Sequence, residues 1–158
     1  MISTLPKKGH LLIAEPSILG DVSFNRSVIL LAEHNDEGSI GFILNKPLSY
    51  NINDLIPEIV ARFKIYNGGP VEQDNLYFIH NIPDLIPIEI SNGIYWGGDF
   101  ESTKELINSG LIGKNNIRFF LGYTGWEEKQ LENEMEDNSW IIARNSYENK
   151  IIGKSSTP

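Results

Sequence analysis

Two apolar runs separated by a short polar loop constrain this sequence more than any other feature. The segment RSVILLAEHNDEGSIGFILNKP spans residues 26–47, and its two runs are SVILLAE (27–33) and SIGFILN (39–45). Both runs are short and rich in β-branched residues, and turn-forming residues bound them, which is typical of a β-hairpin. Their apolar residues are nearly continuous, so we expect both faces of these strands to be covered.

The length of the loop sets the register of this hairpin. With a loop over residues 34–38, about seven strand residues, or roughly 23 Å, separate the loop from the open end. A small-molecule site within the hairpin therefore cannot use both ends. The expected cross-strand pairs are Ser27 with Asn45, Ile29 with Ile43, Leu31 with Gly41, and Glu33 with Ser39.

Other segments have the composition of short strands bounded by turns. We expect strands over 11–15, around 65–69, and over 76–81, 86–91, 93–98, 118–123 and 139–143. A short helix can start at Asn51 or Asn53, although Pro57 disturbs it.

The second half contains clearer helix signals. Asp99 or Ser102 can cap a helix that ends near Ser109, with Gly110 as its stop. Thr124 and Glu127 have the spacing of a capping box for a further helix over about 126–136. That helix would place Leu131 and Met135 on one face, and Trp126 in its first turn would anchor it on the core.

These segments predict one α+β domain over residues 1–158. Its sheet would be mixed, mostly antiparallel and curved, with two or three helices. The tail over 153–158 is expected to be mobile.

Composition excludes several classes of protein. The sequence has no cysteine, which excludes a disulfide scaffold and thiol catalysis and fits a reducing compartment. The apolar run near the N-terminus is interrupted by Glu15 and Pro16 and is too short for a signal peptide or a membrane span, so we expect a cytoplasmic protein without membrane contact. Thirteen basic residues against twenty-one acidic ones give a net charge of −8. Direct nucleic-acid binding is therefore not expected.

The open end of the hairpin is the first candidate site. Arg26 and Lys46 offer cations there, and Asn45 offers both hydrogen-bond donors and acceptors for a small molecule or a protein partner. A structural alternative carries more weight for each residue, because an asparagine shortly before Pro47 is a common way to leave a strand.

A glycine pair and two histidines complete the candidates. Gly68, Gly69 and Pro70 follow a strand; they favour a turn, but they also let a ligand approach the backbone closely. His34 and His80 form a second candidate polar cluster, although His34 can simply bond its own loop. The three histidines of the chain lack the spacing of a local zinc site, so no metal and no cofactor are expected.

Several of these segments together resemble the YqgE/AlgH family of small bacterial proteins. The resemblance runs from about Lys8 to about Ile142 and rests on KGHLLIAEP, DVSFNRSVILLAEH, GSIGFILNKPL, YNGGPV, FIH and LGYTGW…QLENE…SW. It implies a cytosolic α+β domain whose bifurcated sheet folds into a pseudo-barrel. The family's biochemical activity is not established, and some members carry the label of transcriptional regulator. The residues that match the family pattern are Arg26, His34, Gly41, Asn45, Pro47, Gly68, Gly69, Pro70, His80, Gly122, Tyr123, Gly125, Trp126, Gln130 and Leu131.

Three functions follow as hypotheses. The first is a non-catalytic regulatory or binding protein that uses the open hairpin end and the Gly-Gly-Pro turn. The second is an enzyme with His34 or His80 as general base, which predicts a cleft with a histidine beside a carboxylate or a metal. The third is direct nucleic-acid regulation, which predicts a basic patch joining Arg26 and Lys46.

Overall fold

The computed structural model describes most of the chain. Arg26 and the tail over 153–158 lie outside the described residues. The expected binding role of Arg26 and the expected mobility of the tail are therefore not tested. The described residues are 5–14, 27–85, 87–91, 93–137 and 139–143.

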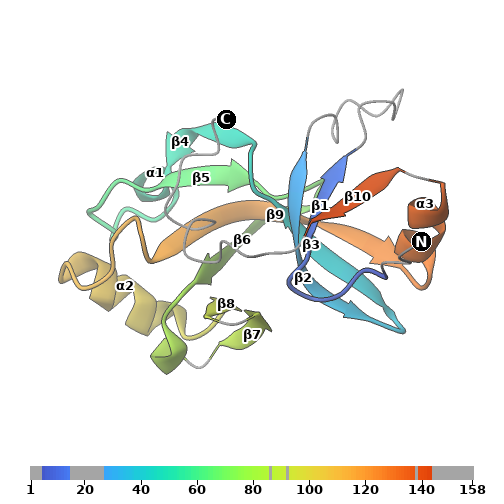
Figure 1. Ribbon diagram of the computed structural model, residues 1–158. Coiled ribbons are helices and arrows are strands. Elements are labelled where there is room, and N and C mark those ends of the chain that lie inside the picture. The colour runs from blue at the N-terminus through green and yellow to red at the C-terminus, as the bar shows by residue number, and fades with distance from the viewer. Residues whose placement is uncertain (1–4, 15–26, 86, 92, 138, 144–158) are drawn as a thin grey trace.

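The apolar segments form one sheet that runs through the molecule, with helices at its two ends (Figure 1). Within the described residues its ten strands are β1 (Leu11–Ala14), β2 (Val28–Asn35), β3 (Gly38–Ile43), β4 (Pro47–Asn51), β5 (Lys64–Asn67), β6 (Val71–His80), β7 (Ile88–Ser91), β8 (Ile94–Trp96), β9 (Ile117–Glu127) and β10 (Trp140–Ala143). The α-helices of the described residues are α1 (Ile52–Leu55), α2 (Phe100–Asn108) and α3 (Gln130–Glu136). Within the described part of the chain, no helix combines the length and apolarity needed to cross a membrane.

The strand pairing confirms a mixed, mostly antiparallel sheet. The main order is β10-β1-β2-β3-β9-β6-β8-β7, while β5 joins β4 to β9. The β5–β9 pair is parallel, and the other pairs are antiparallel. The long strand β9 pairs with β5 over Phe119–Leu121 and with β3 over Thr124–Glu127, which divides the sheet into two branches. The described strands do not close into a barrel.

Both faces of β2 are buried, as its continuous apolar run predicted. Leu30 and Ala32 point into one hydrophobic cluster, and Ile29 and Leu31 point into another, each side chain being fully buried. Alternate residues of a strand point to opposite faces, so the run fills two cores at once.

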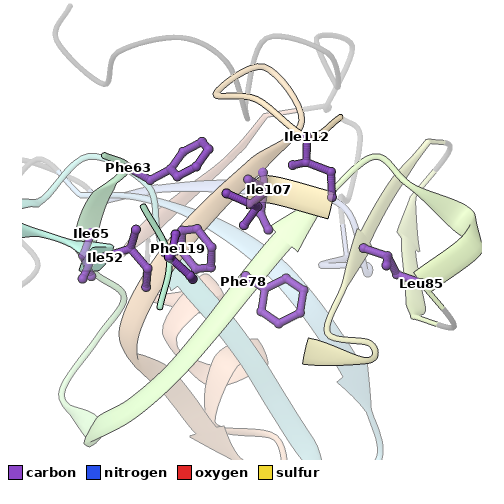
Figure 2. Close-up of a cluster of buried hydrophobic side chains, with 10 residues drawn as sticks. Ile52, Phe63, Ile65, Phe78, Leu85, Ile107, Ile112 and Phe119 are labelled. Atoms are coloured by element: carbon purple, nitrogen blue, oxygen red, sulfur yellow. The ribbon is translucent and has the colours of Figure 1, made fainter. Parts of the chain in front are cut away.

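A third hydrophobic cluster lies at the end of the sheet that carries α1 and α2. Figure 2 shows Phe78 of β6 and Phe119 of β9 beside Ile107 of α2 and Ile52 of α1. Burying these four large side chains fixes the two helices on the sheet, because each fully buried side chain contributes about 1.5–3 kcal/mol.

The first two expected helices are present. In α1 the Asn51 N–H donates to the Asp54 carboxylate at 2.8 Å, and the helix ends at Leu55, ahead of Pro57. The second helix, α2, follows Asp99 as its N-cap residue and stops at Gly110, which has a φ of 83°.

The third helix starts later than predicted. The strand β9 continues through Glu127, because its last four residues pair with β3, and α3 begins only at Gln130. The expected capping box is wrong: the Thr124 hydroxyl donates to the Gly68 carbonyl at 3.1 Å. The face carrying Leu131 and Met135 does pack on the core, as predicted.

Candidate functional site

A β-bulge in β2 decides which side chains share a face near the hairpin loop. Up to Leu31, which lies opposite Gly41, the hairpin keeps the expected register. The register then shifts between Leu31 and Glu33, so Ser39 lies opposite His34 and the expected Glu33–Ser39 pair is wrong. Directly opposed residues point to the same face, so the bulge places the imidazole beside the serine.

His34 lies between a hydroxyl and a carboxylate. Its Nδ1 is 2.5 Å from the Ser39 Oγ, and its Nε2 is 3.5 Å from Glu132 Oε2 on α3. Nucleophilic enzymes use this order of hydroxyl, base and orienting acid. However, the serine is only 6% exposed, and the contact to the carboxylate is long for a hydrogen bond.

The carboxylate of Glu134 fixes α3 on the sheet. Its Oε1 accepts from the indole N–H groups of Trp126 at 3.1 Å and Trp140 at 2.8 Å. Its Oε2 accepts from the Gln130 side-chain amide at 3.0 Å, and Gln130 Oε1 in turn accepts from the Glu127 backbone at 2.9 Å. The helix is thus joined by hydrogen bonds to the ends of both β9 and β10.

A groove of about 840 Å³ lies where the hairpin loop, the end of β9 and the start of α3 meet. Glu33, Glu37 and Glu127 line it, together with the aromatic residues Tyr123 and Trp126. Among the described residues that line this groove, none is a lysine, arginine or histidine. A groove with this lining has the chemistry to receive a cationic group and to pack its apolar part against the Tyr123 ring.

Tyr123 keeps its phenolic proton at neutral pH. Burial, followed by the nearby charge of Glu72, raises the pKa of this phenol above its ordinary value. The same carboxylate accepts from the Tyr77 hydroxyl at 2.9 Å, and the two tyrosine rings meet edge to face. The Tyr123 hydroxyl can therefore act as a hydrogen-bond donor at the end of the groove.

At the open hairpin end, the described residues Asn45 and Lys46 make hydrogen bonds to the backbone. Asn45 Oδ1 accepts from the Val28 N–H at 2.9 Å, and the Lys46 carbonyl accepts from the Asn67 N–H at 2.8 Å. The Asn45 bond closes the open end of the hairpin, and the Lys46 bond joins the hairpin to β5 just before the Gly-Gly-Pro turn. A binding role for Asn45 and Lys46 stays a prediction.

The glycine pair passes directly over β9. A Cβ at Gly68 would lie 2.3 Å from the Gly122 carbonyl oxygen, and one at Gly69 would lie 2.2 Å from the Tyr123 backbone. These glycines are needed for close packing of one segment against another. Pro70 follows them and is exposed.

His80 is fully buried at the far end of β6. Its Nδ1 accepts from the Ile82 N–H at 3.0 Å, and its Nε2 lies 2.7 Å from the Gly97 carbonyl, to which it must donate. Both ring nitrogens are satisfied by the neutral imidazole, and burial lowers its pKa. This geometry supports a structural histidine.

The two candidate histidines do not form one cluster. His34 lies beside Ser39, which pairs with Trp126, whereas His80 pairs with Ile117. Those two partners lie nine positions apart along β9, which corresponds to roughly 30 Å. Across the described residues, no three histidine, aspartate or glutamate side chains gather so that they could hold a metal ion.

The structure contains a buried arginine, Arg118, whose burial was not predicted from the sequence. Arg118 Nη1 donates to the Leu44 carbonyl at 3.0 Å, and its guanidinium lies 4.4 Å above the Tyr66 ring. Burial lowers its pKa. Only its place within the apolar strand RFFLGY hinted that this cation would be enclosed.

Known proteins are similar to this chain in sequence. A family model described as AlgH-like matches residues 11–157. A UPF0301 protein of Cytophaga hutchinsonii is 47% identical over 149 residues, which cover 92% of this chain and 81% of the relative. One from Bacteroides fragilis is 45% identical over 152 residues, with 92% and 76% covered.

Two solved structures share the fold. Protein DIP2367 from Corynebacterium diphtheriae superposes with a TM-score of 0.82 at 24% identity, covering all of this chain and 85% of the other. The AlgH protein from Pseudomonas aeruginosa superposes with a TM-score of 0.73 at 28% identity, and the match covers 99% and 86% of the two chains.

Proposed function

The chain belongs to the AlgH-like family, and from this premise we propose that it is a non-catalytic regulatory or binding protein whose ligand occupies the groove beside α3. One observation carries the proposal: carboxylates and the Tyr123 ring converge on a groove whose volume lies in the range of ligand sites. A cytoplasmic location belongs to the same proposal and is supported by the absence of cysteine from the sequence.

The open hairpin end stays the alternative location for this binding function. The Lys46 carbonyl accepts from the Asn67 N–H, which directly precedes the Gly-Gly-Pro turn. The groove is preferred because the described groups at the open end already bind the backbone: the Asn45 side chain accepts from Val28 within the hairpin, and the Lys46 carbonyl accepts from Asn67 of β5.

A thermal-shift screen against metabolites, divalent metals and short peptides tests the proposal. A ligand at 100 times its dissociation constant stabilises the native state by about 2.7 kcal/mol. We expect hits that stabilise the wild type but not the double variant Glu37→Lys/Glu127→Lys. The matched control, Glu89→Lys/Glu105→Lys, changes the charge equally at exposed sites outside the groove and should keep the shift. Hits that survive the groove substitutions would contradict the proposal.

An enzyme remains the second candidate function, because His34 lies between Ser39 and Glu132. If Ser39 is a nucleophile, a fluorophosphonate probe should label the wild type and should label neither Ser39→Ala nor His34→Ala. An unlabelled wild-type protein would count against serine-based catalysis, which the low exposure of this serine already disfavours.

A further inference from the structure

The strand β9 has an unpaired edge beside the groove. Along one side, β6 pairs with β9 only as far as Tyr123, where Val71 is its last partner. On the other side, the final segment Thr124–Glu127 pairs with β3. Among the described strands, none covers the first side of these last four residues, which measure roughly 13 Å. Unpaired strand edges of this kind are templates for an added strand.

Backbone groups at this edge are directed away from β3. The Glu127 N–H donates to the side chain of Gln130 at 2.9 Å, so a side chain provides the acceptor at this position. Hydrogen bonds alternate between the two sides of an antiparallel strand. The N–H and C=O of Gly125, two residues earlier, therefore face the same edge. Gly125 is exposed and carries no side chain that would cover these groups.

The negative charge around this edge indicates which kind of partner it can bind. Glu33, Glu37 and Glu127 surround the groove, and Glu72 follows the last β6–β9 pair at Val71. A second copy of this chain would bring the same carboxylates together, and the polyphosphate of a nucleic acid would be repelled by them. A segment with lysine or arginine side chains complements this charge.

We infer that the groove binds an extended protein segment bearing lysine or arginine side chains, added as a further strand to the edge of β9 at Gly125. This inference rests on the proposed function and specifies its partner. Backbone hydrogen bonds to the strand edge provide affinity, and the carboxylates provide selectivity for alternate cationic side chains. The half-buried Tyr123 offers a ring against which the aliphatic stems of these cations pack.

Fluorescence polarisation with a labelled Lys-Val-Lys-Val-Lys-Val peptide tests the inference on the full chain. We expect binding that weakens as salt is added, because exposed charges are screened. A Glu-Val peptide of the same length should not bind. A Lys-Val peptide with alternate backbone N–H groups methylated keeps its charge but cannot form the strand ladder, and it should bind at least about tenfold more weakly.

Substitutions locate the binding. We expect Glu37→Lys/Glu127→Lys to weaken binding of the Lys-Val peptide at least about tenfold. The control Glu89→Lys/Glu105→Lys should bind the peptide with unchanged affinity. Melting curves of both variants check that they are folded. Equal binding of the methylated peptide, or no effect of the groove variant, would overturn the inference. Self-association of the chain through the groove would also overturn the inference. Binding of a metabolite that needs the groove carboxylates, with no binding of any peptide, would overturn the inference but leave the proposed function standing.

Discussion

The backbone N–H of Glu127 donates to the side-chain Oε1 of Gln130 at 2.9 Å, at the point where β9 leaves the sheet. Through Gln130 and Glu134, this bond connects the strand edge to the two tryptophans under α3. The groove is thus bounded by the start of a helix that is held by the Glu134 carboxylate and by the packing of Leu131 and Met135 on the core.

Removing that carboxylate should loosen α3. Glu134→Ala leaves the indole N–H groups of Trp126 and Trp140 without this acceptor, and we expect a loss of roughly 2 kcal/mol in the free energy of unfolding. Urea denaturation followed by tryptophan fluorescence measures it. Glu136→Ala, at an exposed position of the same helix, is the matched control and should change stability by less than about 0.5 kcal/mol. Equal effects of the two substitutions would contradict the role given to Glu134.

The glycine pair is predicted to be a packing requirement. Gly68→Ala would bring a Cβ within 2.3 Å of the Gly122 carbonyl oxygen, and we expect a cost of about 2–3 kcal/mol. Gly113→Ala is the control, since its Cβ would have no neighbour closer than 3.9 Å. Chemical denaturation of both variants gives the comparison, and a neutral Gly68→Ala would show that this segment is not tightly packed.

His80 predicts how stability depends on pH. Its folded-state pKa is lowered from 6.5, so at mildly acidic pH the unfolded chain binds a proton that the native imidazole does not. The stability from the neutral imidazole is fully present above pH 6.5 and is lost as the pH falls. Denaturation midpoints measured across this range should decline more steeply for the wild type than for His80→Gln. Identical slopes would contradict the assignment.

Substitution of Asn45 distinguishes a structural role of this residue from a binding role. Because Asn45→Ala removes the acceptor of the Val28 N–H, we expect it to cost about 1 kcal/mol of stability while leaving peptide affinity at the groove unchanged. Urea denaturation and fluorescence polarisation measure the two effects. Loss of affinity without loss of stability would instead favour the open hairpin end as the binding site.

The sequence predicted much of the fold because local signals agreed with the final packing. The apolar run of β2 required two covered faces, and Asp99 and Gly110 marked the limits of α2. The edge strand β4, which begins at Pro47 and is largely exposed, has no apolar pattern and was missed.

The site was harder to predict, because it depends on features with no local signal. Because of the bulge after Leu31, His34 instead of Glu33 points to the same face of the sheet as Ser39. A period-two pattern in the sequence does not reveal where such an extra residue is inserted. Pairing with β3 kept Glu127 in a strand despite a spacing typical of a helix start. Placing Glu132 beside His34 required knowing how α3 packs on the sheet.

An amide NMR titration of the chain with the Lys-Val peptide tests the location of binding most directly. We predict that the largest chemical-shift changes occur at Gly125 and Glu127, on the edge of β9, with Asn45 and Gly68 unchanged. Changes concentrated at Asn45 and Gly68, with Gly125 and Glu127 unaffected, would contradict it.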